Sequence, residues 1–378
     1  MSAALSEQPA RLHSIDQLRG YAVFGMILVN AKGMFGVATK HLTPDDAEGI
    51  WGTVVDQLSH HKDHFTYADT IAPLFMFVVG ISMRLSWLRR SEIVGASATR
   101  KAMAKRFSTL VLIAFTIYMG WLWDALMDIG LAGLLALMFI GTPALVRAIA
   151  ACCMALGYQA IVSFSVYGPW IKRTGDLTAE NIPYLYKWIP YQSTLFDVRL
   201  NGGPFGPLSW CFILLLGTIA YDFMRSGNST GIIAWCLSLG VGLCTAGWIA
   251  SVGWGETKEL WPITAYHMTL PFPLWSTGLC FLTLLIFYVL CDLGPVKFPT
   301  FTSVSMNALF IYIVQCVISE TEAPLEIINS CYGSIQQPLV ESNASLVVPL
   351  GICGILTFYG MLALLAYVLH RKKIYIKI

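Results

Sequence analysis

Charged residues are scarce in this chain. Only 12% of its 378 residues are Asp, Glu, Lys or Arg, whereas 56% are hydrophobic, and the mean hydropathy is +0.64. This composition excludes a soluble domain of this length. The net charge of +2 gives no indication of a nucleic-acid partner. We therefore expect a polytopic integral membrane protein whose main partner is the lipid bilayer.

Several motifs are also absent. The chain has no P-loop and no GxGxxG pattern, which argues against a nucleotide-hydrolysing machine. It contains no tandem repeat, low-complexity linker or soluble domain, so we expect one integral domain. Its ten cysteines show no CxxC spacing, and all but Cys331 lie in or beside apolar runs. Buried packing is therefore the expected role of these cysteines, not a disulfide framework.

Long apolar runs are present throughout the chain. A helix needs about 20 residues to cross a hydrocarbon layer of about 30 Å, which predicts an all-α fold with about ten transmembrane helices. The first run is too long for a removed signal peptide and lacks a small-residue cleavage site. The predicted spans are Leu18–Val37, Ile71–Leu88, Phe107–Trp123, Ile129–Val146, Ile149–Val166, Gly206–Met224, Ile232–Val252, Leu274–Leu290, Val304–Ile318 and Leu346–His370.

The distribution of Lys and Arg predicts the orientation, because short cytoplasmic loops are enriched in both. Most of the 24 basic residues fall on one side if both termini are cytoplasmic. Residues 1–17 then form a cytoplasmic tail, 18–370 the membrane domain and 371–378 a basic cytoplasmic tail. The longer outer loops are 38–69, 167–204, 253–273 and 319–345, and binding chemistry facing outside would draw on them.

Titratable residues gather immediately before the second predicted span. The segment LSHHKDHFTYADTIAPLFMFVVGISMRLSWLRR begins at Leu58 with three histidines and two aspartates and ends in arginines. Ionisable groups at a bilayer boundary cost free energy and usually have a function. In the first span, Asp16 and Arg19 share a helix face, where they form either an interfacial ion pair or part of a site. Asn30 lies near the outer end of that helix.

These segments resemble a known family. SIDQLRG, MILVN and YADTIAPLFMFVVG occur in the order found in the transmembrane acyltransferases related to heparan-alpha-glucosaminide N-acetyltransferase. FDVRLNGGPFGPLSW resembles that family's Asp-Pro-Glu-Gly segment, KELW its Lys-x-Leu-Trp block, and NALFIY its Asn-Ala-Leu-x-x-Tyr block. The similarity extends from Arg11 to about Val317.

The resemblance implies transfer of an acetyl group from cytoplasmic acetyl-CoA to an amine or hydroxyl of a sugar or glycoconjugate on the other side of the membrane. It also points to a homodimer. The chain lacks the large lumenal extension of the lysosomal relative, which favours a bacterial inner membrane. The acceptor itself stays open, as does the choice between direct transfer and a covalent acetyl-His.

The resemblance also assigns site residues. His60 is the first candidate for the catalytic base or acetyl carrier and His61 the second, because both precede a matching Thr66, Asp69 and Pro73. The family's Trp and Gly are missing here, and the loop after Asn30 is longer. Asn30 would stabilise the oxyanion, and Asp69 would either orient the imidazole or cap the helix. The remaining assignments are substrate binding by Asp197, Lys258, Trp261 and Asn307, and cofactor binding by Arg89, Arg90, Lys101 and Lys105.

Two alternatives remain. His60, His61, Asp63 and His64 include good zinc ligands, yet the resemblance explains them without a metal, so none is expected. A secondary transporter or flippase is the competing function, with Asp16, Arg19, Asp124, Asp128 and Asp197 along its path. Transporters often contain two related halves, and the sequence shows no such symmetry.

Overall fold

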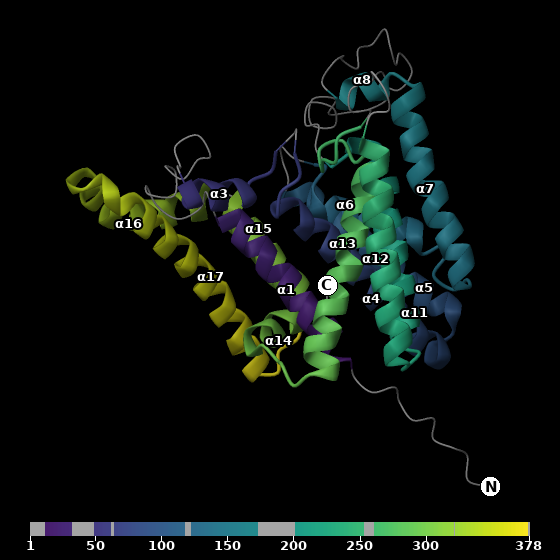
Figure 1. Ribbon diagram of the computed structural model, residues 1–378. Coiled ribbons are helices and arrows are strands. Elements are labelled where there is room, and N and C mark those ends of the chain that lie inside the picture. The colour runs from purple at the N-terminus through teal and green to yellow at the C-terminus, as the bar shows by residue number, and fades with distance from the viewer. Residues whose placement is uncertain are drawn as a thin grey trace.

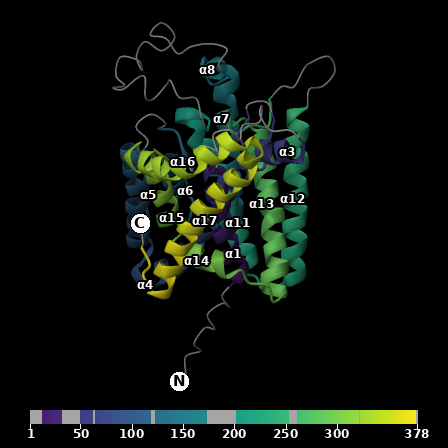
Figure 2. The same ribbon diagram turned by 90° about the vertical axis from the view of Figure 1, so that its left-hand side faces the viewer.

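The computed structural model describes residues 12–31, 49–61, 64–117, 122–172, 201–252, 261–320 and 322–376. Within these ranges the secondary structure is helical and no strand occurs, which confirms the all-α prediction. The long helices lie side by side in a bundle, with α16 lying across one end of it (Figures 1 and 2).

Successive long helices run in alternating directions. We call the end where α1 finishes and α4 begins the histidine end, and the opposite end the arginine end. The start of α1 and the end of α17 both lie at the arginine end (Figure 2). The helices are α1 His13–Asn30, α3 Gly49–Gln57, α4 Ala68–Val94, α5 Ala96–Ile117, α6 Ala125–Ala136, α7 Ala144–Phe164, α8 Tyr167–Ile171, α11 Gly206–Met224, α12 Ser229–Ser251, α13 Pro271–Tyr288, α14 Pro299–Met306, α15 Ala308–Glu320, α16 Glu322–Ser342 and α17 Val347–Arg371.

The predicted number of ten spans is not confirmed. Six described helices are long and apolar enough to cross a membrane, and a seventh is counted if α14 and α15, bent by 83°, form one broken span. The predicted span Ile129–Val146 is wrong in its extent, because α6 has 12 residues and ends at Ala136. A helix of this length covers about 18 Å. The predicted outer loop 319–345 also contains a 21-residue helix, α16.

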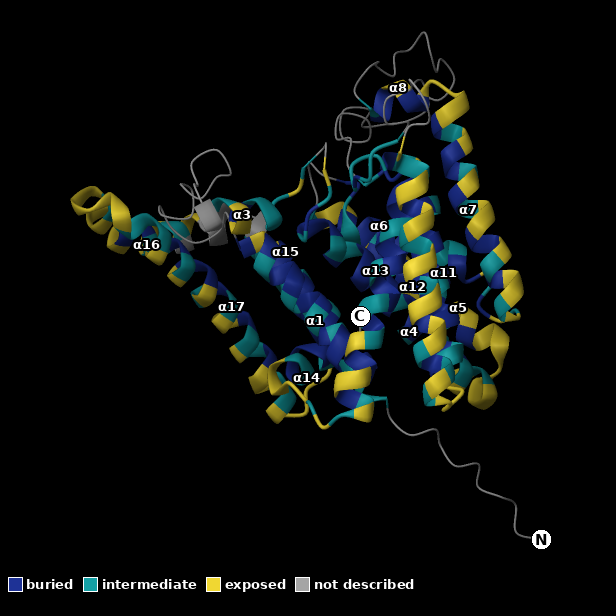
Figure 3. Cartoon of the chain, viewed as in Figure 1, coloured by how far each residue is buried: buried dark blue, intermediate teal, exposed yellow. Residues whose placement is uncertain are grey.

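Apolar side chains cover the outside of the bundle. In α11 78% of the most apolar stretch is buried, whereas in α12 this share is 22% and in α17 it is 28%. The outward faces of α12 and α17 nevertheless carry large hydrophobic residues, among them Trp235, Val241, Trp248, Leu356 and Leu364. Figure 3 shows these faces as exposed. Exposed apolar faces on long apolar helices are compatible with an integral membrane protein.

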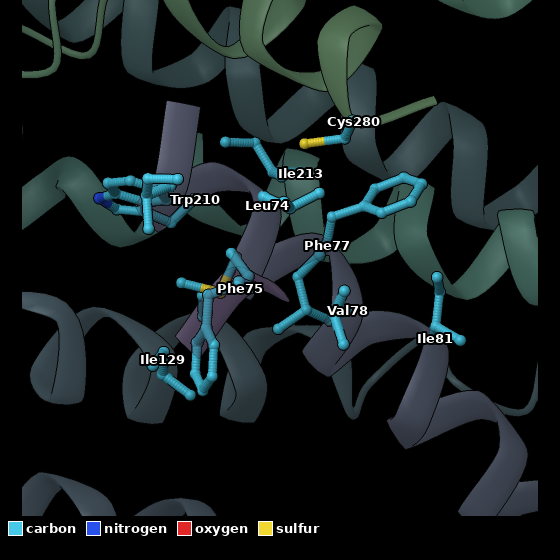
Figure 4. Close-up of a cluster of buried hydrophobic side chains, with 14 of the residues drawn as sticks. Leu74, Phe75, Phe77, Val78, Ile81, Ile129, Trp210, Ile213 and Cys280 are labelled. Carbon is cyan, nitrogen blue, oxygen red and sulfur yellow. The ribbon is translucent and has the colours of Figure 1, made fainter. Parts of the chain in front are cut away.

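Helix α4 occupies the centre of the bundle. Its side chains Leu74, Phe77 and Ile81 are buried, and Phe77 packs edge-on against Phe281 of α13 with ring centroids 5.0 Å apart. Figure 4 shows α4 residues meeting Ile129 of α6 and Trp210 of α11 in the same cluster. Because α4 begins next to the histidine-rich segment, this packing fixes the position of the candidate site.

Two glycines allow α4 and α11 to approach closely. A Cβ atom added at Gly80 would lie 2.0 Å from the backbone oxygen of Leu214, and one at Gly217 would lie 2.1 Å from that of Phe77. Both obstacles are backbone atoms, which cannot move without shifting a helix. Small residues of this kind are common where membrane helices pack.

We expect Gly217→Ala to lower the stability of the protein by about 1–3 kcal/mol, because the added methyl group overpacks the α4–α11 contact. The matched control is Gly242→Ala on α12, where an added Cβ has no neighbour within 4 Å. Alanine favours a helix over glycine by about 1 kcal/mol, so this control should be neutral or stabilising. Thermal unfolding of the detergent-solubilised proteins measures both changes. Equal midpoints for the two variants would contradict the packing argument.

A partly buried ion network joins three helices at the arginine end, with Arg147 fully buried and the Asp222 side chain 25% exposed. Asp222 of α11 accepts from Arg84 Nε of α4 at 2.9 Å and forms a second ion pair with Arg147 of α7. Arg147 is fully buried and also donates to Thr218 Oγ1 at 2.7 Å. Arg84 donates further to the backbone oxygen of Ile140 at 2.6 Å. Each guanidinium therefore has a partner besides the carboxylate, as buried charges require.

Candidate active site

An imidazole and a buried carboxylate meet at the histidine end. His60 Nδ1 lies 2.7 Å from Asp69 Oδ1, and Asp69 is fully buried in the first turn of α4. The His60 side chain is 45% exposed. An ionised carboxylate can only accept hydrogen bonds, so the proton of the neutral imidazole resides on Nδ1. Nε2 then presents its lone pair, which is the arrangement needed for a general base.

The second oxygen of Asp69 is held by Thr66. Thr66 donates to Asp69 Oδ2 from its backbone nitrogen at 3.1 Å and from its hydroxyl at 3.4 Å, and the same hydroxyl approaches the Ser59 backbone oxygen at 2.7 Å. These contacts connect the segment that carries His60 to the start of α4. Asp69 thus orients the imidazole while Thr66 fixes the carboxylate, and both of these residues matched the family motif.

Neighbouring elements support the segment between α3 and α4. Gln57 Oε1 accepts from the backbone nitrogen of Tyr67 at 3.1 Å, and the Tyr67 hydroxyl lies 3.0 Å from that of Tyr21 in α1. Burial raises the pKa of Tyr67 above its usual range, so this phenol stays neutral. Thr264 donates to the backbone oxygen of His61 at 3.3 Å. Contacts with Gln57 of α3, Tyr21 of α1 and Thr264 therefore hold this segment in place.

His61, the second candidate for the base, has a different partner. Its Nε2 lies 3.1 Å from Asp56 Oδ1 in α3, while the carboxylate of Asp69 is taken by His60. His60 is therefore the imidazole held by a fully buried carboxylate, whereas the carboxylate beside His61 is partly exposed.

Asn30 ends α1 with an exposed side chain. Among the described residues no hydrogen bond connects it to His60 or Asp69. The position of Asn30 along the bundle axis follows from the contact between Gly25 of α1 and Ile71 of α4. A Cβ atom added at Gly25 would lie 2.4 Å from the Ile71 side chain. Asn30 lies about 7 Å beyond Gly25, and Tyr67 about 6 Å beyond Ile71 in the same direction. Asn30 is therefore level with the start of α4.

Two further carboxylates lie at the start of α6, and the first of them, Asp124, is close enough to His60 to interact with it electrostatically. Asp124 precedes α6, accepts from its own neighbour Ala125 N at 2.7 Å and from Asn201 Nδ2 at 3.5 Å. Burial raises the pKa of Asp124, and the hydrogen bond from the Ala125 backbone nitrogen opposes that rise. Asp128, one turn further on, is fully buried, and neither of its oxygens has a hydrogen-bond partner among the described residues, although Asn201 lies nearby.

From the sequence, Asp124 and Asp128 are expected only along a transporter path and not in the active site. Their spacing of four residues at the start of an apolar run was the available signal, because it puts both carboxylates on one helix face.

A cavity of about 370 Å³ lies beside α4, and residues of α1, α5, α6 and the Ser305–Leu309 stretch contribute to its lining. Arg19 and Arg106 line it together with Ser82, Ser86 and Ser305, and the Ser305 hydroxyl is buried without a hydrogen-bond partner among the described residues. Arg19 Nη2 donates to Ser82 Oγ at 2.7 Å. The cavity thus offers positive charge and hydroxyl groups on an otherwise apolar wall.

The cavity extends toward the histidine end. Phe75 and Ile129 belong to its lining, and Ile129 directly follows Asp128. Phe75 is about 9 Å along α4 from Asp69, whereas Ser86 is about 26 Å from it. Along α4 the lining therefore runs from Ser86, near the arginine end, to Phe75, which is still about 9 Å from Asp69.

The structure places the other predicted residues as follows. Arg89, Arg90, Lys101 and Lys105 are exposed at the arginine end, and none of the four lines the cavity.

Trp261, predicted to bind substrate, is half-buried. Asn307 lines the cavity, and its amide bonds the backbone of Ile374 at 3.0 Å and of Ile376 at 2.9 Å. Asp16 and Arg19 lie 3.8 Å apart, as their spacing predicts. Asp197, Lys258 and Asp63 lie outside the described residues.

Comparison of the chain with protein-family models and with curated proteins finds no match. The resemblance to the transmembrane acyltransferases therefore depends on the short motifs themselves.

Proposed function

We propose that this chain is a membrane-bound acetyltransferase that uses acetyl-CoA as donor and a sugar or glycoconjugate as acceptor. The observation that carries the proposal is the His60–Asp69 pair, in which a fully buried carboxylate at 2.7 Å orients a partly exposed imidazole. The positive-inside rule places the arginine end in the cytoplasm, and the proposed location is the bacterial inner membrane.

The donor would enter the cavity from the arginine end. CoA carries phosphate groups, and Arg19 and Arg106 provide guanidinium groups suited to them. The apolar wall toward Phe75 would accept the arm that bears the thioester. The thioester would have to extend beyond Phe75 toward Asp69, which holds the proposed catalytic imidazole.

The acceptor's amine or hydroxyl then attacks the thioester carbonyl. A new C–N or C–O bond forms, the C–S bond breaks, and the acceptor's proton passes to His60 Nε2. The CoA thiolate leaves and takes up a proton. Asn30, level with the start of α4, would donate to the oxyanion, and the Asp128 carboxylate would bind a polar group of the acceptor.

A secondary transporter is the second candidate, and one observation favours it. The bend of 83° between α14 and α15 at Asn307 makes a broken span, and broken helices line the substrate sites of many transporters.

The decisive experiment incubates the purified protein with radiolabelled acetyl-CoA and a panel of amino sugars, with a parallel measurement of sugar uptake into proteoliposomes that contain no acetyl-CoA. Transfer of label to a sugar supports the acetyltransferase. Sugar uptake with no label transfer and no binding of acetyl-CoA would favour the transporter and overturn the proposal.

Within that assay, we expect Arg106→Gln to weaken binding of acetyl-CoA about tenfold, because a hydrogen bond to a charged group contributes about 1.5 kcal/mol or more. Lys101→Gln is the matched control, since Lys101 is exposed on the same helix and does not line the cavity. Calorimetric titration with acetyl-CoA measures both constants. A larger loss for Lys101→Gln than for Arg106→Gln would show that the donor binds outside the cavity.

A further inference from the structure

A second cluster of titratable side chains lies beside the candidate active site. The Nε2 atoms of His61 and His64 approach the same oxygen, Asp56 Oδ1, at 3.1 Å and 3.3 Å. All three atoms lie within 4.8 Å of one another, and the two imidazole rings are stacked with centroids 4.2 Å apart. The two histidines therefore point the same nitrogen at one place.

Hydrogen bonding accounts for one of these approaches, since His64 Nε2 and Asp56 Oδ1 form a hydrogen bond of 3.3 Å, but not for the other. His61 Nε2 is a buried atom and, despite its distance of 3.1 Å from Asp56, forms no hydrogen bond of acceptable geometry among the described residues. His61 Nε2 is thus close to the Asp56 oxygen but not directed at it. Two ligand atoms of one metal ion are placed in this way, because both point at the metal and not at each other. Zinc–ligand bonds of about 2.0–2.1 Å in a tetrahedral arrangement separate neighbouring ligand atoms by about 3.3 Å. The two separations from Asp56 match that value.

The cluster is distinct from the His60–Asp69 pair. His60 and His61 are consecutive, yet they use different carboxylates, Asp69 of α4 and Asp56 of α3. The segment bearing His61 is also tied to residue Thr264 by the hydrogen bond to its backbone oxygen. His60 and His61 therefore contact different carboxylates although they are adjacent in the chain.

We propose that Asp56, His61 and His64 bind one zinc ion. Two imidazoles and one carboxylate form a common zinc ligand set, which leaves a fourth position for water or an anionic group. The ion would fasten α3 to the segment that carries His60, a role that goes beyond acetyl transfer. Magnesium and calcium prefer oxygen ligands, so this site should discriminate against both.

The test uses full-length protein purified without a histidine tag and freed of metal with a chelator. Titration with Zn²⁺ against a chromophoric chelator, and with Co²⁺ as a visible-absorption probe, should each give one site per chain. Asp56→Asn and His64→Gln should each weaken zinc binding at least about tenfold, since even residues that only support a ligand contribute tenfold or more. His370→Gln, which removes a histidine at the far end of α17, should bind zinc like the native protein.

Thermal unfolding provides a second measurement that does not depend on enzymatic activity. Zinc should raise the midpoint of the native protein and of His370→Gln, and should not raise that of Asp56→Asn. The metal-free midpoint of Asp56→Asn shows whether that variant is folded. Zinc binding that survives both Asp56→Asn and His64→Gln would overturn the proposal, as would equal affinity for Mg²⁺ and Zn²⁺.

Discussion

His60→Gln is expected to lower the rate of acetyl transfer by about 10²–10⁴-fold, the contribution of a well-placed general base. Glutamine is similar in polarity but cannot accept and release a proton at neutral pH. The His60 side chain is 45% exposed, so this replacement should leave the packing of the bundle intact. The measurement is the turnover number with radiolabelled acetyl-CoA and the best amino-sugar acceptor, together with the affinity for acetyl-CoA, which should change little.

Two companion variants separate the roles within the pair. Asp69→Asn keeps the shape of the side chain, but its amide can donate to His60 Nδ1 and so favour the wrong tautomer, with the proton on Nε2. We expect a loss of turnover approaching that of His60→Gln. His61→Gln should affect turnover much less, because its ring is paired with Asp56. The assignment of the base to His60 would be wrong if His61→Gln were inactive and His60→Gln active.

The membrane character and the helical class could be predicted from the sequence because both depend on composition and on the length of apolar runs. The span Gly206–Met224 coincides with α11, whose apolar run is bounded by glycine and proline before it and by Arg225 after it. The run Ile129–Val146 was harder to interpret, because hydropathy does not show where a helix ends. The chain turns between Ala136 and Ala144 although most of those residues are apolar.

Helix α16 was missed for the opposite reason. Its residues, Glu322–Ser342, are too polar for a span and include Pro338, so the segment was predicted to be a loop. The helix nevertheless forms against the rest of the bundle, where Gln336 Nε2 donates to the Leu350 backbone oxygen at 3.1 Å. Contacts of this kind between distant segments are not visible in local sequence patterns.

The candidate site was predictable in part. Asp69 and His60 could be named because they approximate the family's motif before a span, although they are nine residues apart here and ten in the family, and the structure brings them together. Arg106 could not be distinguished from Arg89, Arg90 or Lys105 by charge alone, because the enrichment of Lys and Arg in cytoplasmic loops accounts for all four. Arg106 differs from the other three because it lines the cavity, and that position depends on how α5 packs against α4.

Asp222→Ala is expected to cost about 3–5 kcal/mol of stability, because it leaves two guanidinium groups without their carboxylate. Arg147 is fully buried and cannot gain water in exchange, and the Arg84 side chain is 12% exposed. The carboxylate is also the point where α4, α7 and α11 are joined at the arginine end. Equilibrium unfolding of the detergent-solubilised protein, followed by circular dichroism, measures the loss. Glu341→Ala, which removes an exposed carboxylate of α16, should change stability by less than about 0.5 kcal/mol.

A double variant tests the reason for that loss. If the cost of Asp222→Ala comes from stranding a buried positive charge, then adding Arg147→Met should recover part of the stability, because methionine fills similar volume and carries no charge. The remaining ion, Arg84, keeps its bond to the Ile140 backbone oxygen. If instead the double variant is as unstable as the sum of the two single variants, the guanidinium of Arg147 is stabilised by Thr218 and by the Thr142 backbone oxygen, which accepts from Arg147 Nε at 3.2 Å, and the carboxylate contributes through packing. The coupling between positions 147 and 222 therefore decides whether charge pairing or packing holds these helices together.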